Sequence, residues 1–380
     1  MTRTDTVIEI PPASLGTQRG LQVRRYGHLG ARPKAYLQTG LHADEIPGML
    51  VMHHLTHLLD AADRERRIRG EIILVPIANP IGLSQYVYGT LLGRYELGSG
   101  ANFNRQYPDI TERVASAVRE QLTEDASANV ATIRCELNKI VASLHPYNEV
   151  DFLRATLLQL AIDADICLDL HCDGQAVLHL YLDTSCWPAA TDLSAQIGSR
   201  ATLLARDSGG NPFDESVAGV WWKLSERFPE HPIPTSCLSG TIELRGSTDV
   251  SDQYAIADAH NLSRFLIRRG VIVGDPGPLP SALCEATPLE GVDMIKSPAA
   301  GVVVYRKELG DWIEAGETVA TIVDPFTHDV DHARHEIVSR INGLLFARRS
   351  DRMARPGQTL CRVAGATPLA DRVGTHLLCD

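Results

Sequence analysis

Residues 34–48, KAYLQTGLHADEIPG, join an expected strand to an expected helix and carry two candidate metal ligands. The alternation over 34–39 is typical of a strand, and Pro47 suits the first turn of the helix that follows. His42 and Glu45 therefore lie three residues apart on a strand-to-helix corner. In open α/β sheets, ligands bind at such corners, outside the carboxyl ends of the strands.

The same alternation of strand-like and helical patterns continues from Leu21 to about Gly270 and predicts an α/β fold with a mixed, largely parallel sheet flanked by helices. Further strands are expected in EIILVPIAN, DICLDLH, AVLHLYL and GTIELRG. Helices are expected at about 47–60, 111–124, 151–163, 189–206 and 252–269. Residues 79–109 have no sustained period, and loops of this length are uncommon unless they are functional.

Composition excludes some classes of protein. The formal net charge of −11 is unsuited to a nucleic-acid partner, because phosphate binding needs a basic surface. No apolar run is long enough to span a membrane, and the first residues lack the apolar segment of a signal peptide, so we expect a cytoplasmic protein. The 8 cysteines form no CxxC pair and are expected to be reduced.

A change of pattern at residues 274–280, GDPGPLP, marks an expected boundary between two domains. Residues 1–275 would form the catalytic domain and residues 285–370 a small all-β domain. The second resembles the barrel-sandwich domains of biotinyl and lipoyl carriers in SPAAGVV and GDWIEAGETVATI. Its expected hairpin tip reads VDPFTHDV without the attachment lysine, and Lys296 lies upstream as a surface lysine, so we expect no attached cofactor.

A metal site is the chemistry that the first stretch suggests. Catalytic zinc usually has three protein ligands, often one closely spaced pair and one distant residue. His42 and Glu45 supply the pair, and His171, at the end of the strand DICLDLH, is the best distant candidate. Such ligands also accept other divalent ions. His53 and His57 in HHLTH are a weaker candidate, because the H-E-x-x-H motif requires glutamate at the position of His54.

An isolated H-x-x-E motif is more often a loop histidine near a solvated glutamate than a metal site. The order of several motifs therefore decides between these two interpretations. GLHADE, ANPIG, NFNRQYP, LDLH and IELR follow one another over residues 39–246. In this order they resemble the succinylglutamate desuccinylase and aspartoacylase family, a branch of the zinc carboxypeptidase-like superfamily. The resemblance implies one zinc ion per chain, held by His42, Glu45 and His171.

The resemblance also implies roles for other residues. Glu243 in IELR would be the general base, and Arg94 would stabilise the oxyanion. The alternatives are that Glu243 is exposed on an edge strand and that Arg94 is a surface residue. Asn104 and Arg105 in NFNR would bind a substrate carboxylate, whose shape a guanidinium matches. Alternatively, Asn104 is a turn residue and Arg105 forms a structural ion pair.

Two further residues are expected to support the site. Asp169 precedes His171 by two residues, so both side chains face the same side of the strand, and Asp169 could orient a site group or be a buried structural residue. Asn79 corresponds to the family's Asn-Pro pair, which shapes the loop, and it could also form a hydrogen bond within the site.

The sequence thus predicts a zinc-dependent amidohydrolase that acts on small N-acylated amino acids or related compounds. A zinc carboxypeptidase acting on small peptides is the alternative within enzymes, and a non-catalytic binding protein on the same fold is the alternative of another class. Motifs do not specify the acyl group, the amine or the oligomeric state, and a homo-oligomer is compatible with them.

Overall fold

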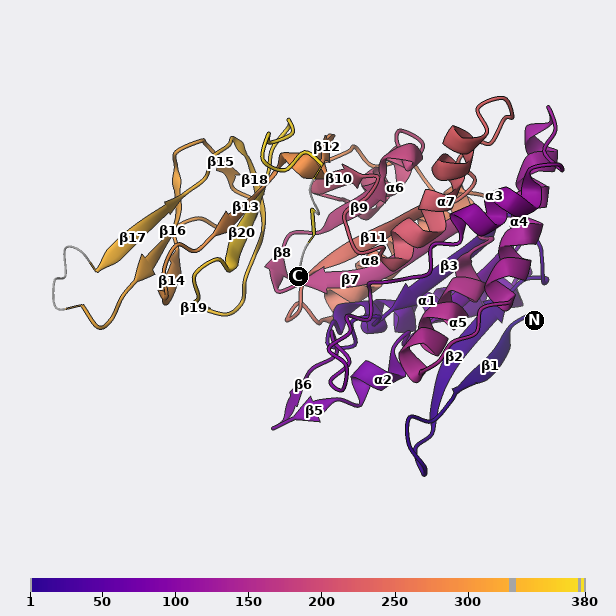
Figure 1. The fold of residues 1–380 in the computed structure, drawn as a ribbon, viewed down its shortest axis with the longest axis horizontal. Coiled ribbons are helices and arrows are strands. Elements are labelled where there is room, and N and C mark those ends of the chain that lie inside the picture. The colour runs from indigo at the N-terminus through magenta and orange to yellow at the C-terminus, as the bar shows by residue number, and fades with distance from the viewer. Residues whose placement is uncertain (1, 328–332, 375–376, 379–380) are drawn as a thin grey trace.

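A computed structural model describes residues 2–327, 333–374 and 377–378 of the chain. A large sheet lies between layers of helices, and a smaller β region lies beside one end of it (Figure 1). The large sheet has the strand order β1-β2-β4-β3-β7-β11-β9-β10-β12. These strands are β1 Thr4–Ile10, β2 Arg19–Tyr26, β3 Lys34–Thr39, β4 Glu71–Val75, β7 Ile166–Asp173, β9 His179–Asp183, β10 Ala201–Ala205, β11 Leu238–Gly246 and β12 Ala286–Pro288.

The centre of this sheet is parallel. Strand β3 pairs in parallel with β4 and β7, and β7 pairs in parallel with β11. The carboxyl ends of these strands therefore lie at one edge of the sheet. Strands β1 and β2 add antiparallel pairings on one side, and β9 joins β11 antiparallel on the other. The expected mixed, largely parallel sheet flanked by helices is confirmed.

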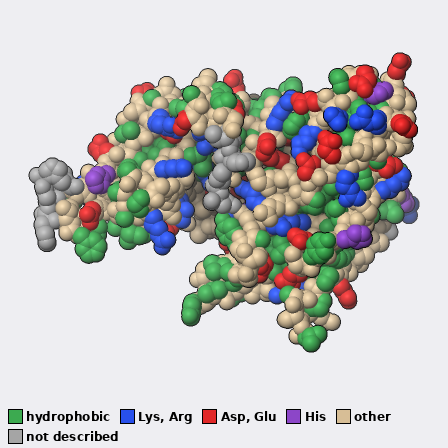
Figure 2. All heavy atoms as spheres, in the orientation of Figure 1, with side chains coloured by type: hydrophobic (Ala, Val, Ile, Leu, Met, Phe, Trp, Pro, Cys, Tyr) green, Lys and Arg blue, Asp and Glu red, His purple; other side chains and the backbone are tan. Residues whose placement is uncertain are grey.

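Helices cover both faces of the sheet, because side chains on its strands alternate between two apolar cores. In β3, Tyr36 belongs to the core under α3, α4, α5 and α7, whereas Ala35 and Leu37 belong to the core under α1, α6 and α8. The helices are α1 Pro47–Arg64, α2 Pro80–Leu83, α3 Thr111–Val118, α4 Ala126–Ala142, α5 Glu149–Ala161, α6 Thr191–Ile197, α7 Phe213–Arg227 and α8 Asp252–Arg268. On the face drawn in Figure 2, acidic and basic side chains are interspersed over α3, α4 and α7.

The expected helix at 189–206 is wrong in its second half. Helix α6 ends at Ile197, and Gly198 follows with φ of 72°, a left-handed conformation that favours glycine and ends a helix. The buried residues after it form β10, which pairs in parallel with β9. Helices α4 and α7 were not among the expected elements. In the described residues, no helix is long and apolar enough to cross a membrane.

The C-terminal β region consists of short antiparallel strands around an apolar core that includes Ile313, Val319 and Leu345. Its strands are β13 Val292–Lys296, β14 Gly301–Tyr305, β15 Trp312–Ile313, β16 Thr318–Val323, β17 Arg334–Val338, β18 Gly343–Arg348, β19 Met353–Ala354 and β20 Thr359–Ala364. The tip between β16 and β17, where a carrier would have its lysine, includes residues 328–332, which lie outside the described residues.

Two pairings link this region to the rest of the chain. Strand β12 joins the large sheet through β10, and β18 pairs with β8, Gln175–Ala176, directly after β7. The region is thus attached beside the carboxyl end of β7. The division into domains at residues 1–275 and 285–370 stays a prediction.

Candidate active site

His42 and Glu45 lie on a loop between β3 and α1 that several backbone contacts fix in place. The Asn79 amide donates to the carbonyl oxygen of Leu41 at 2.9 Å, and the Ala43 N–H donates to the carbonyl oxygen of Gly93 at 3.0 Å. A Cβ atom at Gly93 would lie 2.3 Å from the backbone nitrogen of Asp44, so only glycine allows this approach. Asn79 therefore shapes the loop next to His42.

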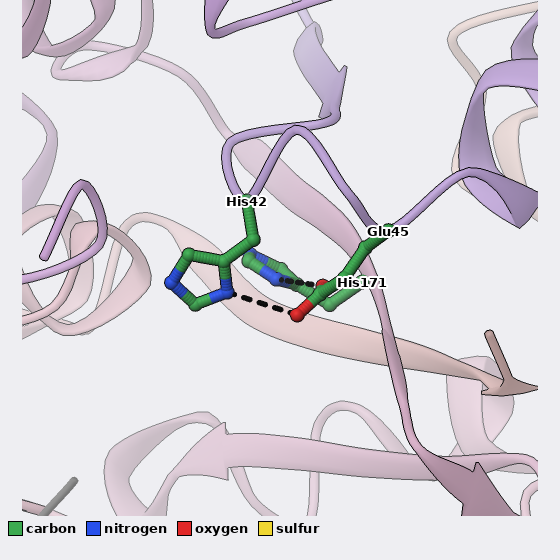
Figure 3. A group of neighbouring side chains, drawn as sticks. All are labelled: His42, Glu45 and His171. Carbon is green, nitrogen blue, oxygen red and sulfur yellow. Dashed lines mark hydrogen bonds and ion pairs between the residues drawn. The ribbon is translucent and has the colours of Figure 1, made fainter. Parts of the chain in front are cut away.

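The parallel strands bring the third candidate ligand to this loop. His171 lies near the carboxyl end of β7, beside β3, and its ring turns toward Glu45 as the ring of His42 does (Figure 3). Glu45 Oε1 is 3.0 Å from His42 Nδ1, and Glu45 Oε2 is 2.7 Å from His171 Nδ1. One donor atom from each residue lies within 4.8 Å of the others. These three residues form a potential metal site.

An oxygen atom near the outer nitrogen of each ring makes the set suitable for a cation. His42 Nε2 lies 2.9 Å from Asn102 Oδ1, and His171 Nε2 lies 2.9 Å from Asp169 Oδ2. His42 Nε2 is thus placed to carry the proton, which leaves a lone pair on Nδ1, and the negative charge of Asp169 favours a proton on the outer nitrogen of His171. Two imidazole nitrogens and a carboxylate fit an ion such as zinc.

The protonation of the two rings depends on their surroundings. Burial, with Arg94 nearby, lowers the pKa of His42 and keeps the neutral form that a ligand needs. Burial also opposes the charged form of His171, but Asp169 and Glu45 outweigh it and raise the pKa of this ring. A cation between the ligands would take the place of that proton.

Glu243 lies at the same edge of the sheet. Its strand β11 pairs in parallel with β7, and Glu243 is directly opposite His171. A bulge follows Glu243, and there Arg245 has φ of 66° and pairs with Asp258 of α8. Among the described residues, the buried Oε2 atom of Glu243 has no hydrogen-bond partner. Burial and the nearby Asp173 raise the pKa of Glu243 well above its usual range.

Arg94 reaches the ligands from the long loop. Its Nη1 atom lies 3.0 Å from His42 Nδ1 and 3.2 Å from Glu45 Oε1, and its side chain is 37% exposed. The guanidinium thus lies next to the potential metal position and borders the pocket in front of it. This is a suitable position for contact with a polar group of a bound molecule.

Asn104 and Arg105 line the same pocket but differ in their contacts. The Asn104 side-chain oxygen accepts from the N–H of Phe213, the first residue of α7, at 2.9 Å, and its amide lies 3.5 Å from His171 Nε2. Arg105 donates from Nη1 to its neighbour's carbonyl oxygen at 2.8 Å and from Nη2 to that of Leu378 at 3.1 Å. A substrate carboxylate on Arg105 would take the place of the Leu378 carbonyl.

Known proteins share this fold and much of this sequence pattern. Residues 31–146 match the sequence profile of the succinylglutamate desuccinylase/aspartoacylase catalytic domain. A structure of a protein of that family from Shewanella amazonensis SB2B is 25% identical and has a TM-score of 0.83, covering 95% of this chain and 98% of that one. These matches support the succinylglutamate desuccinylase/aspartoacylase family for this chain.

Two further relatives match most of this chain. A structure named for succinylglutamate desuccinylase/aspartoacylase from Shewanella frigidimarina NCIMB 400 has a TM-score of 0.85 and 24% identity, covering 97% of this chain and 99% of that one. The N-alpha-acetyl-L-2,4-diaminobutyric acid deacetylase of Halomonas elongata is 23% identical over 354 residues, which are 88% of this chain and 83% of that protein.

Some residues at the site were not among the sequence-based candidates. Asn102, the acceptor for His42, lies in the long loop, where no regular period indicates which side chains point inward. Arg362 of β20 also lines the pocket and pairs with Asp173 at 2.5 Å. Arg362 lines the pocket because the C-terminal β region is attached beside β7. The spacing of motifs in the sequence does not indicate this attachment.

Replacing Asn102 with alanine is expected to weaken metal binding by about 10–100-fold without abolishing it, because His42 loses the acceptor that orients its ring. Titration of the metal-free protein with zinc checks this. Asn138→Ala, a change of the same kind on helix α4, should leave the affinity unchanged. Equal affinity in Asn102→Ala and wild type would show that His42 needs no such acceptor.

Proposed function

We propose that this protein is a zinc-dependent hydrolase that cleaves the amide bond of small N-acylated amino acids, with one zinc ion held by His42, Glu45 and His171. The observation that carries the proposal is the meeting of these three ligand groups with Glu243, a buried carboxylate whose Oε2 has no partner among the described residues. A structural metal site needs no such free carboxylate. A hydrolytic site does, because a base must accept the proton of the attacking water.

When bound, zinc would polarise the amide carbonyl and lower the pKa of a water molecule. Glu243 accepts the proton of the attacking water and then donates it to the leaving amine. Between these steps the carboxylate must hold the proton, and burial with the nearby Asp173 favours that protonated form by raising the pKa of Glu243. The products are a carboxylic acid and an amine.

Two arginines act on the substrate in this proposal. Arg94, next to the ligand atoms of His42 and Glu45, stabilises the negative charge on the carbonyl oxygen during the attack. Arg105 binds the carboxylate of the amino acid, with Asn104 holding the adjacent loop on α7. Asp169 and Asn79 keep His171 and the loop of His42 in position.

Similarity to the succinylglutamate desuccinylase/aspartoacylase family supports the reaction class, because the family is named for deacylases of amino acids. The Halomonas relative is named for the deacetylation of an N-acetyl diamino acid. The pocket is also bordered by Leu289, Met294 and Arg362 from the C-terminal part of the chain. These side chains narrow access to the site, which favours small substrates over long peptides.

Removal of the metal tests the proposal. Dialysis against a chelator is expected to lower the release of free amine from N-acyl amino acids by at least about 100-fold, because polarisation of the carbonyl contributes several kcal/mol. Added zinc should restore the activity. The measurement uses acetyl, succinyl and longer acyl groups on several amino acids, with elemental analysis before and after dialysis.

Other outcomes would contradict the proposal in distinct ways. Release of C-terminal residues from small peptides, without release of amines from any acyl amino acid, would identify a carboxypeptidase. Full activity after complete loss of metal would exclude the zinc-dependent mechanism. Wild-type protein that binds no metal and hydrolyses nothing would support the non-catalytic alternative.

A further inference from the structure

One wall of the pocket has no role in the proposed hydrolysis. It includes Ser208 and Glu215, which line the same pocket as His42 and His171. Ser208 precedes helix α7, and Glu215 lies in the first turn of that helix. Both Glu215 oxygens accept from the Ser208 N–H, at 3.0 and 3.2 Å. The Glu215 side chain is thus held against the Ser208 backbone at one wall of the pocket.

The Ser208 hydroxyl is a second group at this wall to which a ligand could bind. Ser208 is 2% exposed, its N–H donates to Glu215, and its carbonyl oxygen accepts from the Leu378 N–H at 2.9 Å. Its Oγ atom has no hydrogen-bond partner among the described residues. A buried hydroxyl without a partner is unfavourable, so a ligand group in the pocket would stabilise it.

The segment that carries these residues packs against the proposed carboxylate-binding residues. The Gln106 N–H donates to the Gly210 carbonyl oxygen at 2.7 Å, and a Cβ atom at Gly210 would lie 2.6 Å from Arg105 Cδ. The Phe213 N–H contacts Asn104 at 2.9 Å. An amino acid whose carboxylate is bound by Arg105 would therefore present its side chain near this segment.

The charges around Glu215 favour a cation. Burial and the neighbouring Asp214 raise the pKa of Glu215 to about 8, and Asp207 acts in the same direction. A buried carboxylate beside other acids is costly unless it takes up a proton or meets a positive group. An ammonium group provides the charge for Glu215 and an N–H donor for the Ser208 hydroxyl.

We propose that Glu215 and Ser208 form a subsite for an ammonium group, so that the substrates are N-acyl derivatives of amino acids with an amine side chain. This rests on the proposed function and names the substrate class of the same site. The carboxylate of such a substrate would bind Arg105, and its side-chain ammonium would bind Glu215. The acyl amide would then lie toward His42, His171 and Glu243.

The test compares kcat/KM for three Nα-acetyl amino acids with different side chains: 2,4-diaminobutyrate, its neutral isostere norvaline, and aspartate. We expect the diaminobutyrate derivative to exceed the norvaline derivative by about tenfold or more, since a site built for a polar group rejects the analogue without it. In Glu215→Gln, the ratio of these two values should fall by about tenfold or more. Glu226→Gln, an exposed change on the same helix, should keep the wild-type ratio.

The outcomes separate this inference from the proposed function. Hydrolysis of the norvaline or aspartate derivative in preference to the diaminobutyrate derivative would overturn the ammonium subsite alone, as would an unchanged ratio in folded Glu215→Gln. Hydrolysis of none of the three, with metal bound, would overturn the proposed function. If Glu215→Gln does not fold, Ser208→Ala is compared in its place, with the same expected direction.

Discussion

Replacing His171 with alanine is expected to reduce the zinc content from about one ion per chain to near zero and kcat/KM by about 1,000-fold or more. The variant keeps His42 and Glu45, but Glu45 Oε2 loses the imidazole nitrogen at 2.7 Å. Two ligands on one loop hold an ion far more weakly than three from two elements. Elemental analysis and amine release on the same preparation measure both effects.

A second histidine provides the control for this variant. His57 is exposed on helix α1, where its Nε2 atom lies 3.2 Å from that of His53. His57→Ala should retain wild-type zinc content and activity. Circular dichroism of His171→Ala is needed as well, because the change leaves the buried Asp169 without its neighbouring ring. Full zinc content and activity in folded His171→Ala would show that His171 is no ligand.

The order of the motifs and the family resemblance grouped His42, His171 and Glu243 in the sequence, and the strand order of the structure explains why they meet. Each residue comes at or after the carboxyl end of a strand, and β3, β7 and β11 are parallel neighbours. Their side chains must therefore approach one edge of the sheet. The alternation of residues in β7 likewise placed Asp169 on the side of His171, and the two lie 2.9 Å apart.

Other parts of the site depend on contacts that no local pattern reports. Asn102 approaches His42 from a loop without a period. Ser208 and Glu215 border the pocket from the segment before α7 and from its first turn, and this helix is absent from the sequence-based assignment. The expected helix at 189–206 shows a related limit of periodicity. Short apolar runs such as ATLLA fit either a helix or a buried strand. Here the run forms β10, which pairs with β9.

Replacing Glu243 with glutamine should leave zinc bound and lower kcat by about 100-fold to 10,000-fold, because the amide has the shape of the acid but cannot accept the proton. KM should change little, since the side chain acts on the attacking water and the leaving amine. Steady-state kinetics with an N-acyl amino acid, together with zinc analysis, separate the two properties. The expected pattern is thus a lower kcat with little change in KM, whereas a binding defect would raise KM and leave kcat unchanged.

The contrast with His171→Ala decides whether Glu243 acts chemically. Both variants would lose activity, but only His171→Ala should lose zinc, because Glu243 lies opposite His171 on the next strand and is not one of the three grouped ligands. Glu336→Gln, on the exposed side of β17, controls for the loss of one carboxylate and should match wild type. Activity of Glu243→Gln within about threefold of wild type would assign the proton transfer to another group, since a general base contributes at least about 100-fold.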